Sequence, residues 1–113
     1  MFGKLFAKKP NDKAIRKFWK EFEERIDLYA DILENETEDS GDFDWLKQKI
    51  GKSLKLCCLD TTVGYDFRLE TTRSPARLVF LHKNNDYLKA VGERMLALYP
   101  EQLANKIAFA VAE

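Results

Sequence analysis

The sequence lacks the features that mark several familiar classes of protein. Its 113 residues include five glycines, three prolines, two cysteines and one histidine, and its 19 basic side chains equal its 19 acidic ones. The zero net charge argues against a general nucleic-acid binder, which carries a basic excess. No apolar run approaches the roughly 20 residues of a membrane-spanning helix. The 45% apolar content is too high for a disordered chain.

The cysteine content indicates a reducing compartment. Cys57 and Cys58 are adjacent, and neighbouring cysteines rarely pair because so small a ring strains the disulfide geometry. We therefore expect no disulfide framework and a cytoplasmic location. Two cysteines and one histidine are too few for a zinc site, and no phosphate-binding glycine loop or calcium loop occurs. We predict no metal and no cofactor.

The neutrality is the sum of segments with opposite charge. Residues 1–20 hold seven basic side chains against Asp12, a net of +6. Residues 21–44 hold eleven acidic side chains against Arg25, a net of −10. Residues 45–113 carry a net of +4. Such asymmetry is a reason to look for local partners. We expect part of it to cancel internally, with lysines of residues 47–55 facing the acidic segment.

The first ten residues differ from the rest. Residues 1–10 form a basic segment that we expect to be flexible, with Phe2, Leu5 and Phe6 able to share one face of a short helix. Such a segment makes at most a weak contact with an anionic membrane surface. Residues 11–113 read as a single domain, which stands alone or is the N-terminal part of a longer protein.

Apolar periodicity predicts three helices. The first is capped by Asn11 or Asp12 and runs to about residue 35, and the second runs from an Asp42 cap to about residue 57. The third begins after Asn84 or Asn85 and ends before Pro100. Gly51 lies inside the second helix and weakens it. The three buried stripes are Ile15, Phe18, Trp19, Phe22, Ile26, Tyr29 and Leu33; Phe43, Leu46, Ile50, Leu54 and Cys57; and Tyr87, Leu88, Val91, Met95 and Leu98.

Three segments read as strands. Residues 63–70 alternate between apolar and polar side chains, residues 77–82 are apolar on both faces, and residues 106–112 alternate again. The order α-α-β-β-α-β predicts an α+β fold, with a three-stranded, mostly antiparallel sheet packed by helices. The first two strands form a hairpin, and the last two are joined by a right-handed crossover. Strand order 1-2-3 is favoured over 2-1-3 because the alternating first strand suits an edge.

A three-stranded sheet with helices on one face leaves its other face open. Val79 and Leu81 (or Leu78 and Phe80), with Ala108 and Ala110, then form an apolar surface, which usually marks an interface. We expect this face to bind a second copy or a further domain, unless a helix covers it. Trp45 lies one step off the stripe of its helix, and we predict that it is half exposed and acts as an interface anchor.

Catalytic candidates are sparse. His82 is the only histidine, and a general base at this position needs an orienting carboxylate from Asp60, Asp66 or Asp86. Cys58 is the candidate thiol nucleophile, with His82 as its base. No spacing in the sequence brings these residues together.

Three hydrophobic features resemble a known group of proteins. They are a Phe18-Trp19-x-x-Phe22 helix, a hairpin around Thr71–Pro75, and a closing helix and strand with Tyr87, Met95, Pro100 and Phe109. Together they resemble a group of uncharacterised bacterial proteins in which a Trp-x-x-Phe helix precedes an α+β domain. That resemblance implies a bacterial origin and no particular activity.

The absence of an assembled catalytic set favours a non-enzymatic protein-interaction or accessory module, forming a homodimer through the open sheet face. One alternative is a small hydrolase or transferase that uses His82 with a nearby aspartate. The other is a regulatory domain that contacts a membrane surface through residues 1–10.

Overall fold

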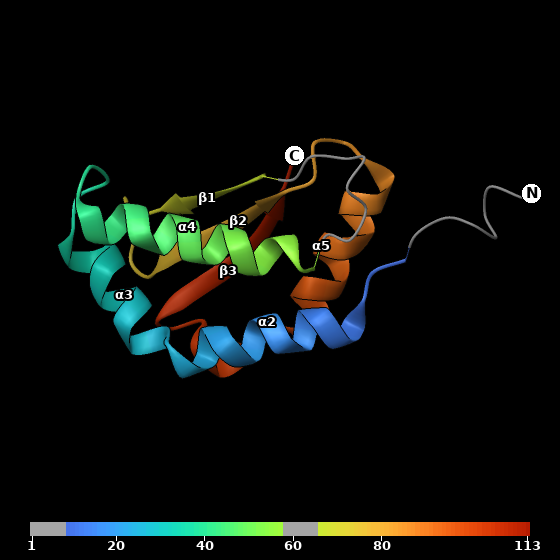
Figure 1. The fold of residues 1–113 in the computed structure, drawn as a ribbon, viewed down its shortest axis with the longest axis horizontal. Helices are drawn as coiled ribbons and strands as arrows, with labels where there is room; N and C mark the ends of the chain where they lie inside the picture. Colours follow the sequence, from blue (N-terminus) through green and yellow to red (C-terminus); the bar gives the residue numbers. More distant parts are fainter. Residues whose placement is uncertain (1–8, 58–65) are drawn as a thin grey trace, which may run out of the picture.

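The computed structural model describes residues 9–57 and 66–113, and the chain has the predicted α+β fold. Its elements follow one another along the chain as shown in Figure 1. They are α2 (Asp12–Glu24), α3 (Ile26–Asn35), α4 (Gly41–Lys55), β1 (Asp66–Glu70), β2 (Ala76–Leu81), α5 (Asp86–Leu98), the short 3₁₀ helix η1 (Glu101–Leu103) and β3 (Ile107–Ala112). The predicted segment 1–10 lies outside the described residues except for its last two positions. Cys58, Asp60 and the first three residues of the predicted strand 63–70 also lie outside them.

The sheet has the order β1-β2-β3, which is the order that the sequence favoured. β1 and β2 are antiparallel, with Phe67 opposite Phe80. β2 and β3 are parallel, with Val79 opposite Ala110, and α5 makes the crossover between them. β2 is therefore the central strand, which explains why its sequence is apolar on both faces.

Helices α2, α4 and α5 pack on one face of the sheet. A Cβ atom added at Gly92 of α5 would lie against Val111 and Phe80, and one added at Gly51 of α4 would contact Phe67. The indole ring of Trp19 on α2 packs edge-to-face on Phe109, with ring centroids 4.8 Å apart. Strand alternation places all these sheet residues on one face, so the core lies between that face and the helices.

The first predicted helix is two helices, which corrects the expectation of one helix to residue 35. α2 ends at Glu24 and α3 begins at Ile26, because Arg25 leaves the helical region with φ −113° and ψ 11°. The N–H group of Arg25 bonds to the Phe22 carbonyl oxygen at 3.2 Å, a tightened turn. The buried stripe continues through the bend, so apolar periodicity alone did not reveal it.

Side-chain caps fix the starts of three helices. The Asn11 side chain accepts a hydrogen bond from the Ala14 N–H group, and the Asn85 side chain accepts one from that of Leu88, each at 3.0 Å. Ser40 caps α4 by accepting from the Phe43 N–H group at 3.1 Å. The predicted cap, Asp42, instead lies in the first turn of α4, where its charge favours the helix dipole.

Candidate protein-binding surfaces

The second face of the sheet carries none of the helix contacts described above. From the register, the β2 and β3 side chains on this face are Arg77, Val79, Leu81, Ala108, Ala110 and Ala112. Of the predicted interface residues, Val79, Leu81, Ala108 and Ala110 therefore lie together on this face, while Leu78 and Phe80 are buried in the core. The role of the first four as an interface stays a prediction.

One predicted interface residue on this face is not accessible. Val79 is only 1% exposed, and the register places it between Arg68 of β1 and Ala110 of β3. Glu70 accepts hydrogen bonds from the Nε atoms of Arg68 and Arg77, each at 2.8 Å. These two hydrogen bonds hold the pKa of Glu70 below its ordinary value, and the bond from Arg68 has the largest effect. The β1 half of this face is therefore charged, and the accessible apolar part lies along β3.

The outer edge of β3 presents unpaired backbone. The Ala112 carbonyl oxygen accepts from the His82 N–H group at 2.9 Å and thus points toward β2. Because backbone groups alternate along a strand, those of Phe109 and Val111 point away from β2. Among the described residues, these outward groups of Phe109 and Val111 form no hydrogen bond. The outward carbonyl of Ile107 accepts a hydrogen bond from the Tyr99 hydroxyl group.

Trp45 is 44% exposed, as the sequence predicted. Its ring meets that of Tyr29 from α3, with centroids 6.3 Å apart and planes at 66°. Trp45 belongs to α4, which packs on the helix-covered face of the sheet. It therefore does not form one surface with Leu81, Ala108 and Ala110, as a single interface would require.

Among the described residues, the predicted catalytic group around His82 is not assembled, and its other candidates Cys58 and Asp60 lie outside those residues. The Nδ1 atom of His82 accepts a hydrogen bond from the Asn84 N–H group at 2.9 Å, so it carries no proton to donate to a carboxylate. The carboxylate of Asp66 lies 3.4 Å from the Lys83 ammonium group, and Asp86 occupies the first turn of α5. Within the described ranges, no hydrogen bond joins His82 to a carboxylate.

The cysteine position that the structure describes is in the core. Cys57 is fully buried, and its sulfur lies 3.6 Å from the Ala14 carbonyl oxygen. This agrees with the prediction that Cys57 packs as a small apolar side chain. Over residues 9–57 and 66–113, no group of three or more histidine, cysteine or acidic side chains is placed to hold a metal ion.

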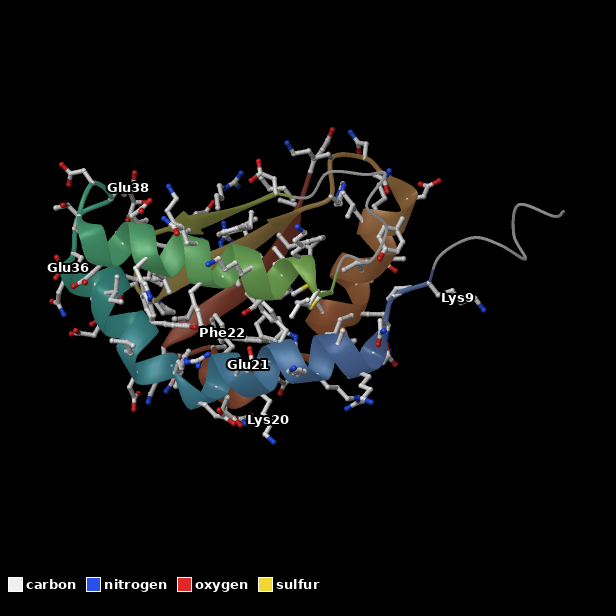
Figure 2. The ribbon with its side chains drawn as sticks, viewed as in Figure 1. Lys9, Lys20, Glu21, Phe22, Glu36 and Glu38 are labelled. Carbon is white, nitrogen blue, oxygen red and sulfur yellow. The ribbon has the colours of Figure 1, made fainter. Side chains whose placement is uncertain are left out.

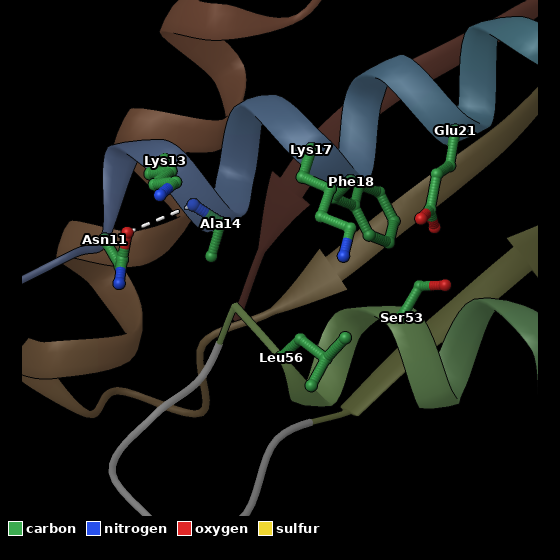
Figure 3. Close-up of a pocket in the computed structure, with 8 residues that line it drawn as sticks. All are labelled: Asn11, Lys13, Ala14, Lys17, Phe18, Glu21, Ser53 and Leu56. Carbon is green, nitrogen blue, oxygen red and sulfur yellow. Dashed lines mark hydrogen bonds between the residues drawn. The ribbon is translucent and has the colours of Figure 1, made fainter.

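A groove that the sequence did not predict separates α2 from α4, which run side by side in opposite directions (Figure 1). The α2–α4 groove has a volume of about 280 Å³. Figure 3 shows Lys17 and Glu21 reaching from α2 toward α4, and Leu56 reaching back from the end of α4. The other residues of its lining are Asn11, Lys13, Ala14, Phe18 and Ser53. A narrower hollow shares Phe18, Glu21 and Ser53 with it and extends the groove to Tyr29 and Ile50.

The two charged segments meet within α2, where Lys20 and Glu21 are neighbours, and only their far ends lie apart. Figure 2 shows Glu36 and Glu38 at the end where α3 meets α4, and Lys9 at the other end. The α4 lysines, which we expected to face the acidic segment, form no ion pair with it among the described residues, although Lys47 lines one hollow together with Glu38. Asp27 of the acidic segment instead pairs with Lys106.

The chain matches no protein-family model, and no curated protein or solved structure is significantly similar to it. No helix among the described residues is long and apolar enough to cross a membrane. The function must therefore be argued from the surfaces themselves.

The sequence does contain a signal for the groove. Lys13, Ala14, Lys17 and Phe18 place two lysines beside a small and an aromatic residue at helical spacing. That pattern is equally typical of the boundary between the buried and the solvated side of any amphipathic helix. Only the separation of α2 from α4 turns the boundary into a groove.

Proposed function

We propose that this chain is a non-enzymatic protein-interaction module that pairs with a second copy of itself along β3. The observation that carries the proposal is the outward backbone of Phe109 and Val111, which has no hydrogen-bond partner in the described part of the chain. An edge strand with free N–H and C=O groups is a template for pairing with another strand. The resemblance to bacterial proteins and the lack of a disulfide framework favour a bacterial cytoplasmic setting.

The composition of β3 supports pairing. Natural edge strands usually carry a charged residue or a proline that blocks association, but Ile107–Ala112 (IAFAVA) contains neither. Alanines at positions 108, 110 and 112 occupy the face of β3 away from the core. Their small side chains let a second strand and its sheet face approach closely.

One register uses all the free groups of Phe109 and Val111. In an antiparallel pair related by a two-fold axis, Ala110 lies opposite the partner's Ala110, and Phe109 lies opposite the partner's Val111. Phe109 and Val111 then exchange N–H···O=C bonds in both halves of the pair. The Ile107 carbonyl, which is already bonded to Tyr99, is not needed. The same register brings the alanines of the two copies together on one sheet face.

Sedimentation velocity measured across a wide range of protein concentration tests the proposal. We expect the wild-type chain to dimerise, and Ala110→Lys and Ala110→Glu to be monomeric because each places like charges opposite one another at the two-fold axis. An equimolar mixture of the two variants should dimerise again, because opposite charges then meet. Thr72→Lys, at an exposed position in the β1–β2 turn, is the control and should dimerise like the wild type.

Two outcomes would reject the proposal. A wild-type chain that stays monomeric at every concentration excludes self-pairing. A dimer that survives Ala110→Lys unchanged uses another surface. Circular dichroism and urea unfolding of each variant separate a lost dimer from a lost fold.

A further inference from the structure

The α2–α4 groove lies on elements that the β3 pairing does not use, and its floor is apolar. Phe18 forms the base and is 4% exposed, whereas Leu56 at the rim is 58% exposed. Figure 3 shows the Leu56 side chain directed across the groove toward α2. A large apolar side chain held in water beside an apolar hollow is typical of a site that a partner's side chains fill.

The rim of the groove is basic. Lys13 and Lys17 line it from α2. On α4, Lys49 and Lys52 precede Ser53 and Leu56 by four residues and so lie on the same side of the helix. None of these lysines is within 4 Å of a carboxylate in the described residues. Glu21 is the one acidic side chain of the lining.

The dimensions favour a helical occupant. Ala14 and Glu21 are seven residues apart on α2, which corresponds to about 10 Å along a helix. That length matches the distance between the first and last apolar side chains at positions i, i+3, i+4 and i+7 of an amphipathic helix. A volume of about 280 Å³ suits a few aliphatic side chains, and it is just below the range of sites that enclose drug-sized ligands.

We propose that the α2–α4 groove binds an acidic amphipathic helix of a partner protein. Its apolar side chains fill the hollow over Phe18 and against Leu56, and its carboxylates pair with the lysines of the rim. A membrane surface carries the same charge and is also apolar below its headgroups, but a bilayer does not enter a concave groove between two helices. The concave shape therefore favours a peptide over a lipid surface.

Fluorescence anisotropy with three labelled synthetic peptides tests the proposal. The first has leucines at i, i+3, i+4 and i+7 and glutamates on its other face. The second has the same composition with the leucines scattered around the helix, and the third has lysines in place of the glutamates. We expect only the first to bind, and its affinity to fall as salt is added, because exposed ion pairs are screened.

Substitutions at the rim of the α2–α4 groove test whether the peptide binds there. The double variant Lys13→Glu with Lys17→Glu should weaken binding by about tenfold, since each reversal turns an attraction into a repulsion. Leu56→Asp should also weaken binding, because it removes the apolar contact with the peptide. Lys20→Glu makes the same charge change on α2 at a residue that points away from α4 (Figure 2), so it should change the affinity by less than about twofold. Ala110→Lys should not affect the peptide, which separates this proposal from the pairing of β3.

Three results would overturn the proposal. The first is equal binding of the patterned and the scattered peptide. The second is an affinity that the double lysine reversal does not change in a variant with wild-type circular dichroism. The third is binding to phosphatidylserine vesicles, lost in the double variant, without binding of the acidic peptide, which would assign the groove to a membrane surface. If the double variant fails to fold, Lys17→Met, which keeps the aliphatic stem, provides the same comparison.

Discussion

The indole nitrogen of Trp19 donates a hydrogen bond to the main-chain oxygen of Met95, 2.9 Å away and 76 residues further along the chain. Met95 lies in the last turn of α5, where carbonyl groups have no partner within the helix. Trp19 is 2% exposed and also packs on Phe109. One side chain therefore joins α2 to the end of α5 and to β3.

We predict that Trp19→Phe lowers the free energy of unfolding by about 1–3 kcal/mol, because it leaves the buried Met95 oxygen unpaired. Urea unfolding measures the change. The matched control is Trp45→Phe at the exposed tryptophan, which should change the stability by less than about 0.5 kcal/mol. Equal losses in the two variants would show that the hydrogen bond is not the cause.

Gly51 and Gly92, the glycines inside α4 and α5, should respond to alanine with opposite changes in stability. At Gly51 the nearest atom to an added Cβ is 3.7 Å away, which is ordinary contact. Gly51→Ala should therefore stabilise the fold by about 0.5–1 kcal/mol through helix propensity. At Gly92 the added Cβ would lie 2.7 Å from a Val111 methyl group, and Gly92→Ala should destabilise by about 1–3 kcal/mol through overpacking.

A second substitution tests whether the clash with Val111 is the reason that Gly92→Ala destabilises the fold. Removing the Val111 methyl groups makes room for the added Cβ, so Gly92→Ala with Val111→Ala should lose less stability than the sum of the two single variants. If the losses of stability are additive, the clash with Val111 is not the reason that Gly92→Ala destabilises the fold. Thermal unfolding of the four proteins is sufficient to decide this.

Burial raises the pKa of Tyr99 from its ordinary value of 10.0 to about 12. The neutral phenol is therefore favoured in the fold. Its contribution to stability is complete below pH 10 and is lost as the pH rises toward 12. We expect tyrosinate absorbance to show a late titration step that Tyr99→Phe removes. A Tyr99 that titrates with the ordinary value would contradict this account of its burial.

The pKa of Asp12 is lowered, first by its hydrogen bonds from Arg94, which span 2.9 and 2.7 Å. Because the folded value is the lower one, the contribution of Asp12 to stability is present above its ordinary pKa and is lost as the pH falls through the folded value. Arg94→Gln should return the pKa of Asp12 toward its ordinary value in a nuclear magnetic resonance titration. Arg73→Gln, in the exposed turn after β1, should leave it unchanged.

Local chemistry accounts for what the sequence predicted well. Asn11 and Asn85 are caps because their side chains bond the first free N–H groups of a helix, which is a property of neighbouring residues. The apolar character of β2 on both faces reflects its central place in the sheet. The stripe with Phe18, Trp19 and Phe22 is buried as its spacing requires.

The expectations that the structure does not support concern features that hydrophobic periodicity does not report. The bend at Arg25 is invisible to periodicity because the buried stripe runs straight through it. The lysines of α4 form no ion pair with the acidic segment among the described residues, although α4 begins within that segment. His82 was a plausible base until the turn after β2 occupied its Nδ1 atom.

The sequence by itself determined the α+β class, the order of the elements and the apolar face of each helix, because these follow from periods of about 3.6 and 2 residues along the chain. Tertiary structure alone decided where surfaces remain open. The alanines of β3 become a face, and Lys17 and Leu56 become the rim of a groove, only through the placement of α2 and α4 on the other side of the sheet. That placement depends on contacts such as Trp19 with Met95, which join residues far apart in the chain.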